Sequence, residues 1–128
     1  MRNQGEIWLA DLNPRRGTEP GRVRPVLIVQ NQALLDIDHP STLVIPLTTN
    51  LVDDAQPLRV RIKARARLEK DSDLLLDQLR AIDNTRLTSG PLARLDKNIL
   101  GQVAQALREV LGLDDALRSS EPIKNGGD

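Results

Sequence analysis

The chain of 128 residues contains no cysteine, phenylalanine or tyrosine, and it has a single tryptophan and a single histidine. Without cysteine there is no disulfide, no thiolate nucleophile and no Cys-ligated zinc site. One histidine, without an HExxH motif or paired acids, gives no support for metal-dependent hydrolysis. Phosphate-binding loops of the GxxxxGKT and GxGxxG types are also missing. We therefore expect neither a metal nor a cofactor.

Long apolar runs are also missing. No stretch approaches 18 apolar residues, and the first residues, MRNQGEIW, lack the apolar centre of a signal peptide. These features predict a soluble, cytoplasmic protein that does not enter a membrane.

Trp8 is the only aromatic residue, so the core must be built from aliphatic side chains. It also means that RNA recognition by aromatic stacking has almost no support. The formal net charge is zero, which argues against a bulk nucleic-acid binder. However, 14 of the 18 basic residues are arginines, the cation best suited to bidentate phosphate contacts. Residues 59–70 hold six basic residues and one acid.

Alternating or continuous apolar patterns predict five short strands, in residues 6–12, 25–30, 42–49, 57–64 and 73–83. The run at 25–30 has the pattern of a strand covered on both faces. Pro46 marks an edge, a bulge or the end of its strand. The segment 73–83 is expected to carry the last strand.

Alternation in the segment 57–64 predicts two different faces. The inward face is expected to hold Leu58, Val60, Ile62 and Ala64. The other face, Arg59, Arg61 and Lys63, is expected to be solvated, with contact to RNA or a partner protein as the alternative.

Residues 95–113 predict a helix, with Asp96 as N-cap and Gly112 just past its end. Its apolar face is expected to hold Ile99, Val103, Leu107 and either Val110 or Leu111. No other periodic segment is long enough for a crossover helix, which argues against a doubly wound parallel sheet. The expected fold is mostly β with helices (α+β). It is a small antiparallel barrel of about five to seven strands with the C-terminal helix packed on it. We expect one domain in residues 1–115 and a disordered tail in 116–128.

Four segments, read in order, resemble one protein family. These are RNQGEIWLADLNPRRGTEPGRVRPVLIVQN, TLVIPLTT, KDSDLLLDQLRAID and TRL. Together they resemble the MazF/PemK toxins of bacterial toxin–antitoxin pairs. The resemblance implies an SH3-like barrel, a homodimer and metal-independent cleavage of single-stranded mRNA at short sequence motifs. It also implies a MazE-like antitoxin that covers the RNA site with an acidic, flexible segment.

Carried over by position, the resemblance assigns catalysis to Arg24 and Thr48. Residues with a possible catalytic or RNA-binding role are Glu19, Asp77, Gln78 and Arg80. Residues expected along the groove for RNA or antitoxin are Arg15, Arg16, Thr18, Arg22 and Thr49. One branch of the family has a histidine where this chain has Thr18 and an arginine where it has Leu75. The acid–base scheme of that branch therefore does not transfer.

The expected reaction is attack of a ribose 2′-OH on its own phosphate, leaving a 2′,3′-cyclic phosphate and a 5′-OH. Arginine stays protonated at neutral pH, so Arg24 suits charge stabilisation rather than the role of base. Thr48 would donate a hydroxyl beside it. Glu19, Asp77 and solvent all remain open as the base.

Simpler structural roles are the alternatives for several residues. Asp77 and Arg80 could form a structural ion pair, Trp8 a packing or interface contact, and His39 part of a solvated turn in DIDHP, residues 36–40. Two rival functions are a CcdB-like protein that poisons DNA gyrase without catalysis, and a family member that only binds antitoxin or RNA.

Overall fold

The computed structural model of this chain describes residues 2–14, 16–19 and 21–113. Arg15, a predicted groove residue, and the predicted tail 116–128 lie outside the described residues. The described elements, in chain order, are β1 (Glu6–Asp11), β2 (Val23–Ile28), α1 (Gln32–Asp36), β3 (Ser41–Thr48), β4 (Arg59–Ile62), β5 (Ser72–Leu75), the 3₁₀ turn η1 (Leu76–Gln78), β6 (Arg80–Asp83), the 3₁₀ turn η2 (Asn84–Arg86), β7 (Leu87–Arg94) and α2 (Lys97–Leu111).

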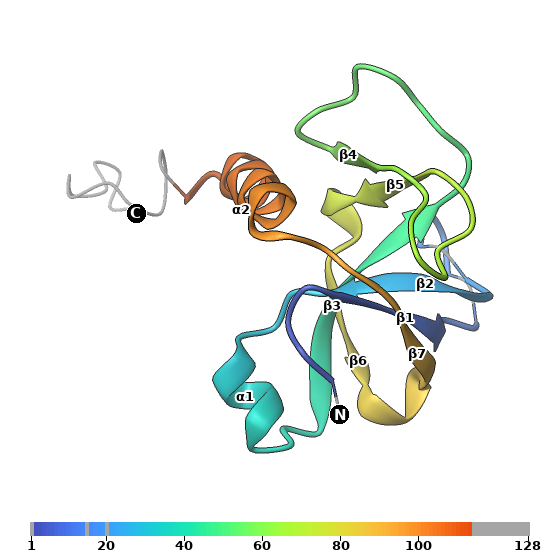
Figure 1. The fold of residues 1–128 in the computed structure, drawn as a ribbon, viewed down its shortest axis with the longest axis vertical. Helices are drawn as coiled ribbons and strands as arrows, with labels where there is room; N and C mark the ends of the chain where they lie inside the picture. The colour runs from blue at the N-terminus through green and yellow to red at the C-terminus, as the bar shows by residue number, and fades with distance from the viewer. Residues whose placement is uncertain (1, 15, 20, 114–128) are drawn as a thin grey trace, which may run out of the picture.

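The strands form one antiparallel seven-stranded sheet in the order β4-β5-β3-β2-β1-β7, and β6 pairs with the first half of β3 (Figure 1). The sheet curls so that its two ends approach each other. The loop between β4 and β5 contacts β7 through a hydrogen bond of 2.8 Å from the Arg67 N–H to the Leu92 carbonyl. The prediction of a mostly β domain with a C-terminal helix is confirmed. Its strand ladder is open rather than fully closed.

The core is aliphatic, as the lack of aromatic residues requires. Side chains such as Ile7, Leu27, Ile45 and Leu74 are fully buried between the curled sheet and α2. The aliphatic stretch Val26–Ile28 of β2 is buried throughout, which confirms a strand covered on both faces.

Helix α2 begins and ends as predicted. Asp96 accepts a hydrogen bond of 2.9 Å from the Ile99 N–H, and Gly112 ends the helix with a φ of 66° in the left-handed region. Val103 is buried and Val110 packs on the core, whereas Leu111 is exposed. Val110 is therefore the core residue of the two alternatives.

The prediction for residues 73–83 is wrong in two respects. This segment is divided into β5, η1 and β6, and it does not carry the last strand, which is β7. Gly90 and Pro91 inside β7 have the composition of a turn, so its sequence does not predict a strand. Gly90 has a packing role instead: a Cβ there would lie 2.5 Å from Trp8 Cδ2. Helix α1, with five residues, is too short to give a periodic signal.

Strand β4 is shorter than predicted. Val60 and Ile62 point into the core, but Leu58 and Ala64 lie outside the strand and are exposed, so their predicted burial is wrong. Pro46 lies inside the central strand β3, where the partner changes from β6 to β5. A residue without an N–H is compatible with this break in the ladder.

Candidate active site

Arg24 lies inside β2, which begins at Val23, two residues before the predicted start. β2 and β3 pair with Val26 opposite Pro46, and the same register extended by two residues puts Arg24 opposite Thr48. The Arg24 Nη1 donates to the Leu47 carbonyl at 3.3 Å, and its Nε donates to the Gly21 carbonyl at 3.0 Å. The structure thus brings the two predicted catalytic residues together at adjoining strand ends.

Arg24 is half-buried, with its guanidinium fixed by two backbone carbonyls. Thr48 is also half-buried, and its Oγ1 accepts a hydrogen bond of 3.1 Å from the Asn50 N–H. A hydroxyl that accepts from the backbone keeps its own proton available for a neighbouring acceptor. This pair can therefore offer several donors to one anionic group.

The loop between β1 and β2, residues 12–22, lies beside this pair. Its base is closed by a bond of 2.9 Å from the Leu12 N–H to the Arg22 carbonyl. Arg86 donates to the carbonyls of Asp11 and Asn13 at 2.9 and 2.6 Å, which attaches the loop to η2. Arg86 belongs to the TRL segment, but the sequence did not indicate this role.

A second group of predicted residues lines a hollow of about 240 Å³. Its lining is Glu19, Asp77, Gln78, Leu79 and Arg80. The Arg80 Nη1 lies 4.0 Å from the Glu19 Oε1, so the ion partner of Arg80 is Glu19 and not Asp77. This long, half-solvated contact leaves Arg80 able to exchange Glu19 for another anion.

The loop 12–22 connects the two groups. Gly21 accepts the hydrogen bond from Arg24, and Glu19, two residues earlier, faces Arg80. The predicted groove residues described in this part of the chain, Arg16, Thr18, Arg22 and Thr49, are all exposed. These residues follow or precede Arg24 and Thr48 on the adjoining loops, and their side chains are open to solvent.

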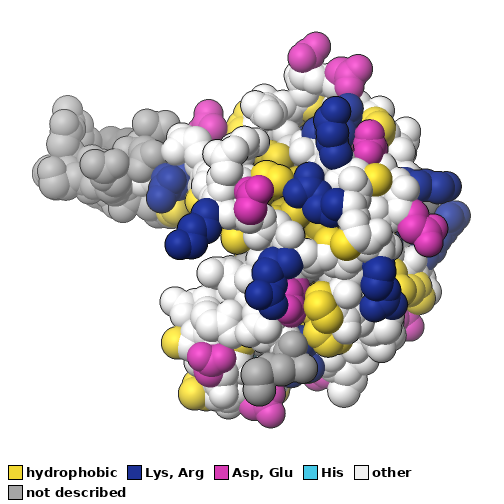
Figure 2. All heavy atoms as spheres, in the orientation of Figure 1, with side chains coloured by type: hydrophobic (Ala, Val, Ile, Leu, Met, Phe, Trp, Pro, Cys, Tyr) yellow, Lys and Arg dark blue, Asp and Glu magenta, His cyan; other side chains and the backbone are white. Residues whose placement is uncertain are grey.

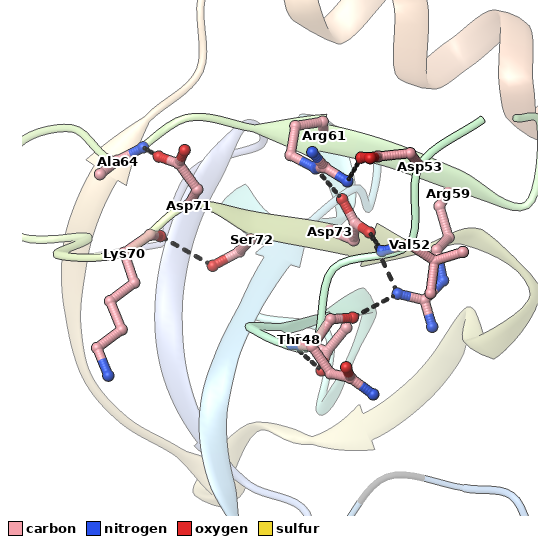
Figure 3. Close-up of polar contacts among 11 residues, drawn as sticks. Thr48, Val52, Asp53, Arg59, Arg61, Ala64, Lys70, Asp71, Ser72 and Asp73 are labelled. Carbon is pink, nitrogen blue, oxygen red and sulfur yellow. Dashed lines mark hydrogen bonds and ion pairs between the residues drawn. The ribbon is translucent and has the colours of Figure 1, made fainter. Parts of the chain in front are cut away.

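The structure also contains a charged cluster around Asp73 that the sequence did not indicate (Figure 3). Asp73 is only 1% exposed, and it accepts hydrogen bonds from Arg61 Nε at 2.5 Å, Arg59 Nη1 at 3.2 Å and the Val52 N–H at 2.9 Å. Burial raises the pKa of the Asp73 carboxyl, but these hydrogen bonds, that from Arg61 first, outweigh burial and lower the pKa below its ordinary value.

On the predicted solvated face of β4, Arg61 is exposed as predicted and Arg59 is half-buried, but both side chains are paired with Asp73. One sequence feature could have indicated this ion pair. Asp73 stands directly before the apolar run 74–76, and the preceding strand carries alternating arginines. The hollow here, about 630 Å³, has three carboxylates, Asp53, Asp54 and Asp73, against the two guanidinium groups. Its cations are neutralised, so it does not suit a phosphate.

A similar buried carboxylate holds the start of β1. Glu6 is 2% exposed and accepts from Arg94 at 2.6 Å and from Trp8 Nε1 at 3.0 Å. Burial raises the pKa of Glu6, but the bonds from Arg94, Trp8 and Asn3 outweigh it and lower the pKa. Trp8 also covers Gly90, so it is a packing residue, as predicted.

Of the predicted turn at residues 36–40, Asp36 is the last residue of α1 and residues 37–40 form the exposed turn that contains His39. Within residues 2–14, 16–19 and 21–113, no three His, Asp or Glu side chains are arranged to hold a metal ion. In the same part of the chain, no helix has both the length and the apolar character to cross a membrane. Figure 2 shows acidic and basic side chains intermixed over one face, in keeping with the zero net charge.

Comparison with known proteins agrees with this geometry. The model of a family described as "PemK-like, MazF-like toxin of type II toxin-antitoxin system" matches residues 3–111. A protein of Bacillus subtilis (strain 168) named Endoribonuclease EndoA is 39% identical over 116 residues, which cover 88% of this chain and 96% of that protein.

Solved structures show the same fold. MazF from Deinococcus radiodurans superposes with a TM-score of 0.72 at 22% identity, covering 87% of this chain and 96% of that one. An endoribonuclease from Mycobacterial species, solved in complex with its cognate antitoxin, has a TM-score of 0.69 at 20% identity, with 88% and 97% coverage.

Proposed function

The chain belongs to the family of PemK-like, MazF-like toxins of type II toxin–antitoxin systems, and from this premise we propose that it is a cytoplasmic, sequence-specific endoribonuclease of single-stranded mRNA. Cleavage of mRNA would inhibit translation and growth. The B. subtilis relative named as an endoribonuclease supports the activity. The observation that supports the site most strongly is the juxtaposition of Arg24 and Thr48 at adjoining strand ends. The proposed toxin domain spans residues 1–115.

The reaction uses the substrate's own nucleophile. The ribose 2′-oxygen attacks the adjacent phosphorus while the bond from phosphorus to the 5′-oxygen breaks. The 2′-hydroxyl gives its proton to a base, and the departing 5′-oxygen takes up a proton. The products are a 2′,3′-cyclic phosphate and a 5′-OH. Alignment and charge stabilisation supply the catalysis, so this chemistry does not need a metal.

In this scheme the Arg24 guanidinium contacts the non-bridging oxygens of the scissile phosphate, where negative charge grows in the transition state. The Thr48 hydroxyl donates to the same group. Glu19, Asp77 and solvent are the candidate bases, and Gln78 and Arg80 would hold the RNA beside them. The half-buried position of Arg24 strengthens its effect, because screening by water is reduced there.

Neutralisation by an antitoxin fits the same surface. An acidic, flexible segment of a MazE-like partner would compete with RNA for Arg24 and Arg80, whose ion partner Glu19 is only loosely held. The structurally similar mycobacterial endoribonuclease, solved in complex with its cognate antitoxin, supports this part of the proposal. Mixing the antitoxin with the toxin should abolish cleavage at equimolar ratio.

We propose that the toxin acts as a homodimer. Exposed apolar side chains near α1 and on β3, among them Ile37 at 72% and Leu43 at 40% exposure, are available for such an interface. Sedimentation of the purified chain should give twice the monomer mass of 14.2 kDa. A monomer at all concentrations would contradict this part.

The test of the activity is cleavage of a long single-stranded transcript in excess chelator, followed by mapping of both ends of each fragment. We expect fragments that begin with a 5′-OH and share a short sequence at the cut. Cleavage only with added magnesium, or fragments with a 5′-phosphate, would contradict the mechanism. Intact mRNA together with DNA-damage signalling in expressing cells would favour a gyrase poison instead.

A further inference from the structure

A groove of about 560 Å³ begins directly beside the candidate active site. Its lining includes Pro25 and Thr49, the residues that follow Arg24 and Thr48 in the sequence. From there it passes between β7 and the loop 63–71, which joins β4 to β5. Because side chains alternate along a strand, Pro25 faces the groove on the side of β2 that carries Leu27, whereas Arg24 lies on the side that carries Val26. RNA in the groove would pass around the start of β2 to reach Arg24.

The groove has an apolar floor and a charged rim. Leu68 and Leu92 are buried in the floor, and Leu9 and Pro25 are half-buried beside them. Arg67 and Lys70 are exposed on the rim. A floor of this kind can take the apolar face of a sugar or base, while the cations reach phosphates above it.

The backbone of the rim is held in place before any ligand binds. The Arg67 N–H bonds the Leu92 carbonyl at 2.8 Å, and Arg65 and Leu68 exchange two backbone hydrogen bonds of 2.9 and 2.8 Å. Asp71 accepts from the Ala64 N–H at 2.7 Å and closes the loop. Such preorganisation lowers the entropy cost of binding.

The rim cations differ from the other basic residues of segment 59–70. Arg59 and Arg61 are paired with Asp73, whereas neither Arg67 nor Lys70 has an ion pair in the described part of the chain. Among the described residues, the Arg67 side chain makes one hydrogen bond, a long one of 3.5 Å to the Pro91 carbonyl. Glu69 is the only acid in the groove lining. The rim keeps a net positive charge.

We propose that this groove holds the RNA segment next to the scissile phosphate, with Arg67 and Lys70 contacting its phosphates, and that it adds affinity without reading sequence. The inference rests on the endoribonuclease function proposed above. Phosphate contacts carry no sequence information, and an aliphatic floor gives no base-specific hydrogen bonds. Sequence reading would then belong to other parts of the site.

The test compares Arg67→Gln, Lys70→Gln and the double variant with the wild-type protein on one long single-stranded transcript. Each single change should raise KM about threefold to fivefold with kcat unchanged. The slope of log(kcat/KM) against log of salt concentration should fall by about 0.7 for each phosphate-binding cation that is replaced, and the cut sites should stay the same. Lys63→Gln is the matched control, because Lys63 is exposed on the same loop but does not line the groove.

Both substitutions leave the backbone hydrogen bonds of the loop intact, so the variants should unfold at the wild-type midpoint. Unchanged KM and salt slope in the double variant, an equal effect in Lys63→Gln, or altered cut sites would overturn the inference. So would unchanged RNA kinetics with weakened antitoxin binding, which would assign the groove to a protein. Absence of any cleavage by the wild-type protein would instead contradict the proposed function.

Discussion

The hollow around Asp73 and the groove beside Arg67 both draw on the basic segment 59–70, yet they use its cations in opposite ways. In the hollow, Arg59 and Arg61 close on a carboxylate that is 1% exposed. In the groove, Arg67 and Lys70 stand in solvent above an apolar floor. In the hollow, the arginine charges are neutralised by Asp73, which links β4, β5 and the loop after β3. In the groove, the charges of Arg67 and Lys70 stay available to a ligand. A count of basic residues in a segment therefore says little about binding until the acids that face them are known.

Among the cations proposed to contact RNA, substitution of Arg24 should have the largest effect on kcat/KM. Arg24→Ala should lower kcat/KM by about 10²- to 10³-fold, because it removes the donors aimed at the developing charge. The variant should remain folded, since each hydrogen bond to a carbonyl that is removed costs only about 1 kcal/mol. Arg24→Lys keeps the charge but lacks the paired donors, so its kcat/KM should lie between those of the wild-type protein and Arg24→Ala. Full activity of Arg24→Ala would remove this residue from the mechanism.

On the structural side, the largest effect should come from Asp73. Asp73→Asn removes the counter-charge of Arg59 and leaves Arg61 with only the exposed Asp53. It should lower the free energy of unfolding by about 2–3 kcal/mol, less than for a fully buried pair because both arginines are partly solvated. Denaturant unfolding measures this. The control is Asp53→Asn, which removes only the exposed partner of Arg61 and should cost less than about 0.5 kcal/mol. Equal losses in both variants would contradict the assignment.

The Thr48 hydroxyl should have a smaller catalytic effect than Arg24. Thr48→Val keeps the shape of the side chain and should lower kcat about threefold to tenfold, the range for one hydrogen bond. Thr48→Ser keeps the hydroxyl and should cleave nearly as fast as the wild-type protein. Single-turnover cleavage of one transcript compares the three forms. A strong loss in Thr48→Ser would show that the hydroxyl is not the feature that matters.

Lowering the pH should reduce the stabilisation that the buried carboxylates provide. The pKa of Asp73 is lowered in the folded state, so its contribution to stability is complete above its ordinary value of 3.8 and is lost as the pH falls through the lower, folded value. Glu6 should contribute in the same direction below its ordinary value of 4.5. The free energy of unfolding should therefore drop below about pH 4. In Asp73→Asn this drop should be shallower, and an identical drop would contradict the role of Asp73.

Much of the fold could be predicted from local patterns. Continuous or alternating apolar runs indicated β1, β2 and β3, and the cap residues Asp96 and Gly112 indicated both ends of α2. Strand β7 could not be predicted, because Gly90 is there for contact with Trp8 and its composition imitates a turn. The residue type at such a position is determined by contacts with a neighbouring strand, and these contacts produce no periodic pattern in the local sequence.

The candidate site divides in the same way. Family resemblance identified Arg24 and Thr48, and the structure brings them together. The ion partners were beyond reach, because pairing depends on strand register: Asp73 lies opposite Arg61 only once β4 and β5 are aligned. For the same reason the sequence suggested Asp77 as a partner of Arg80, whereas Glu19, on a distant loop, is its partner.

The most direct test of the division between the two regions is to measure Arg61→Gln and Arg67→Gln side by side, each for its free energy of unfolding and for the salt dependence of kcat/KM on one transcript. Arg61→Gln should lower the free energy of unfolding and keep the wild-type salt slope. Arg67→Gln should keep the free energy of unfolding and reduce the slope by about 0.7. The reverse pattern, or the same pattern in both variants, would contradict the division of the arginines into structural and RNA-binding sets.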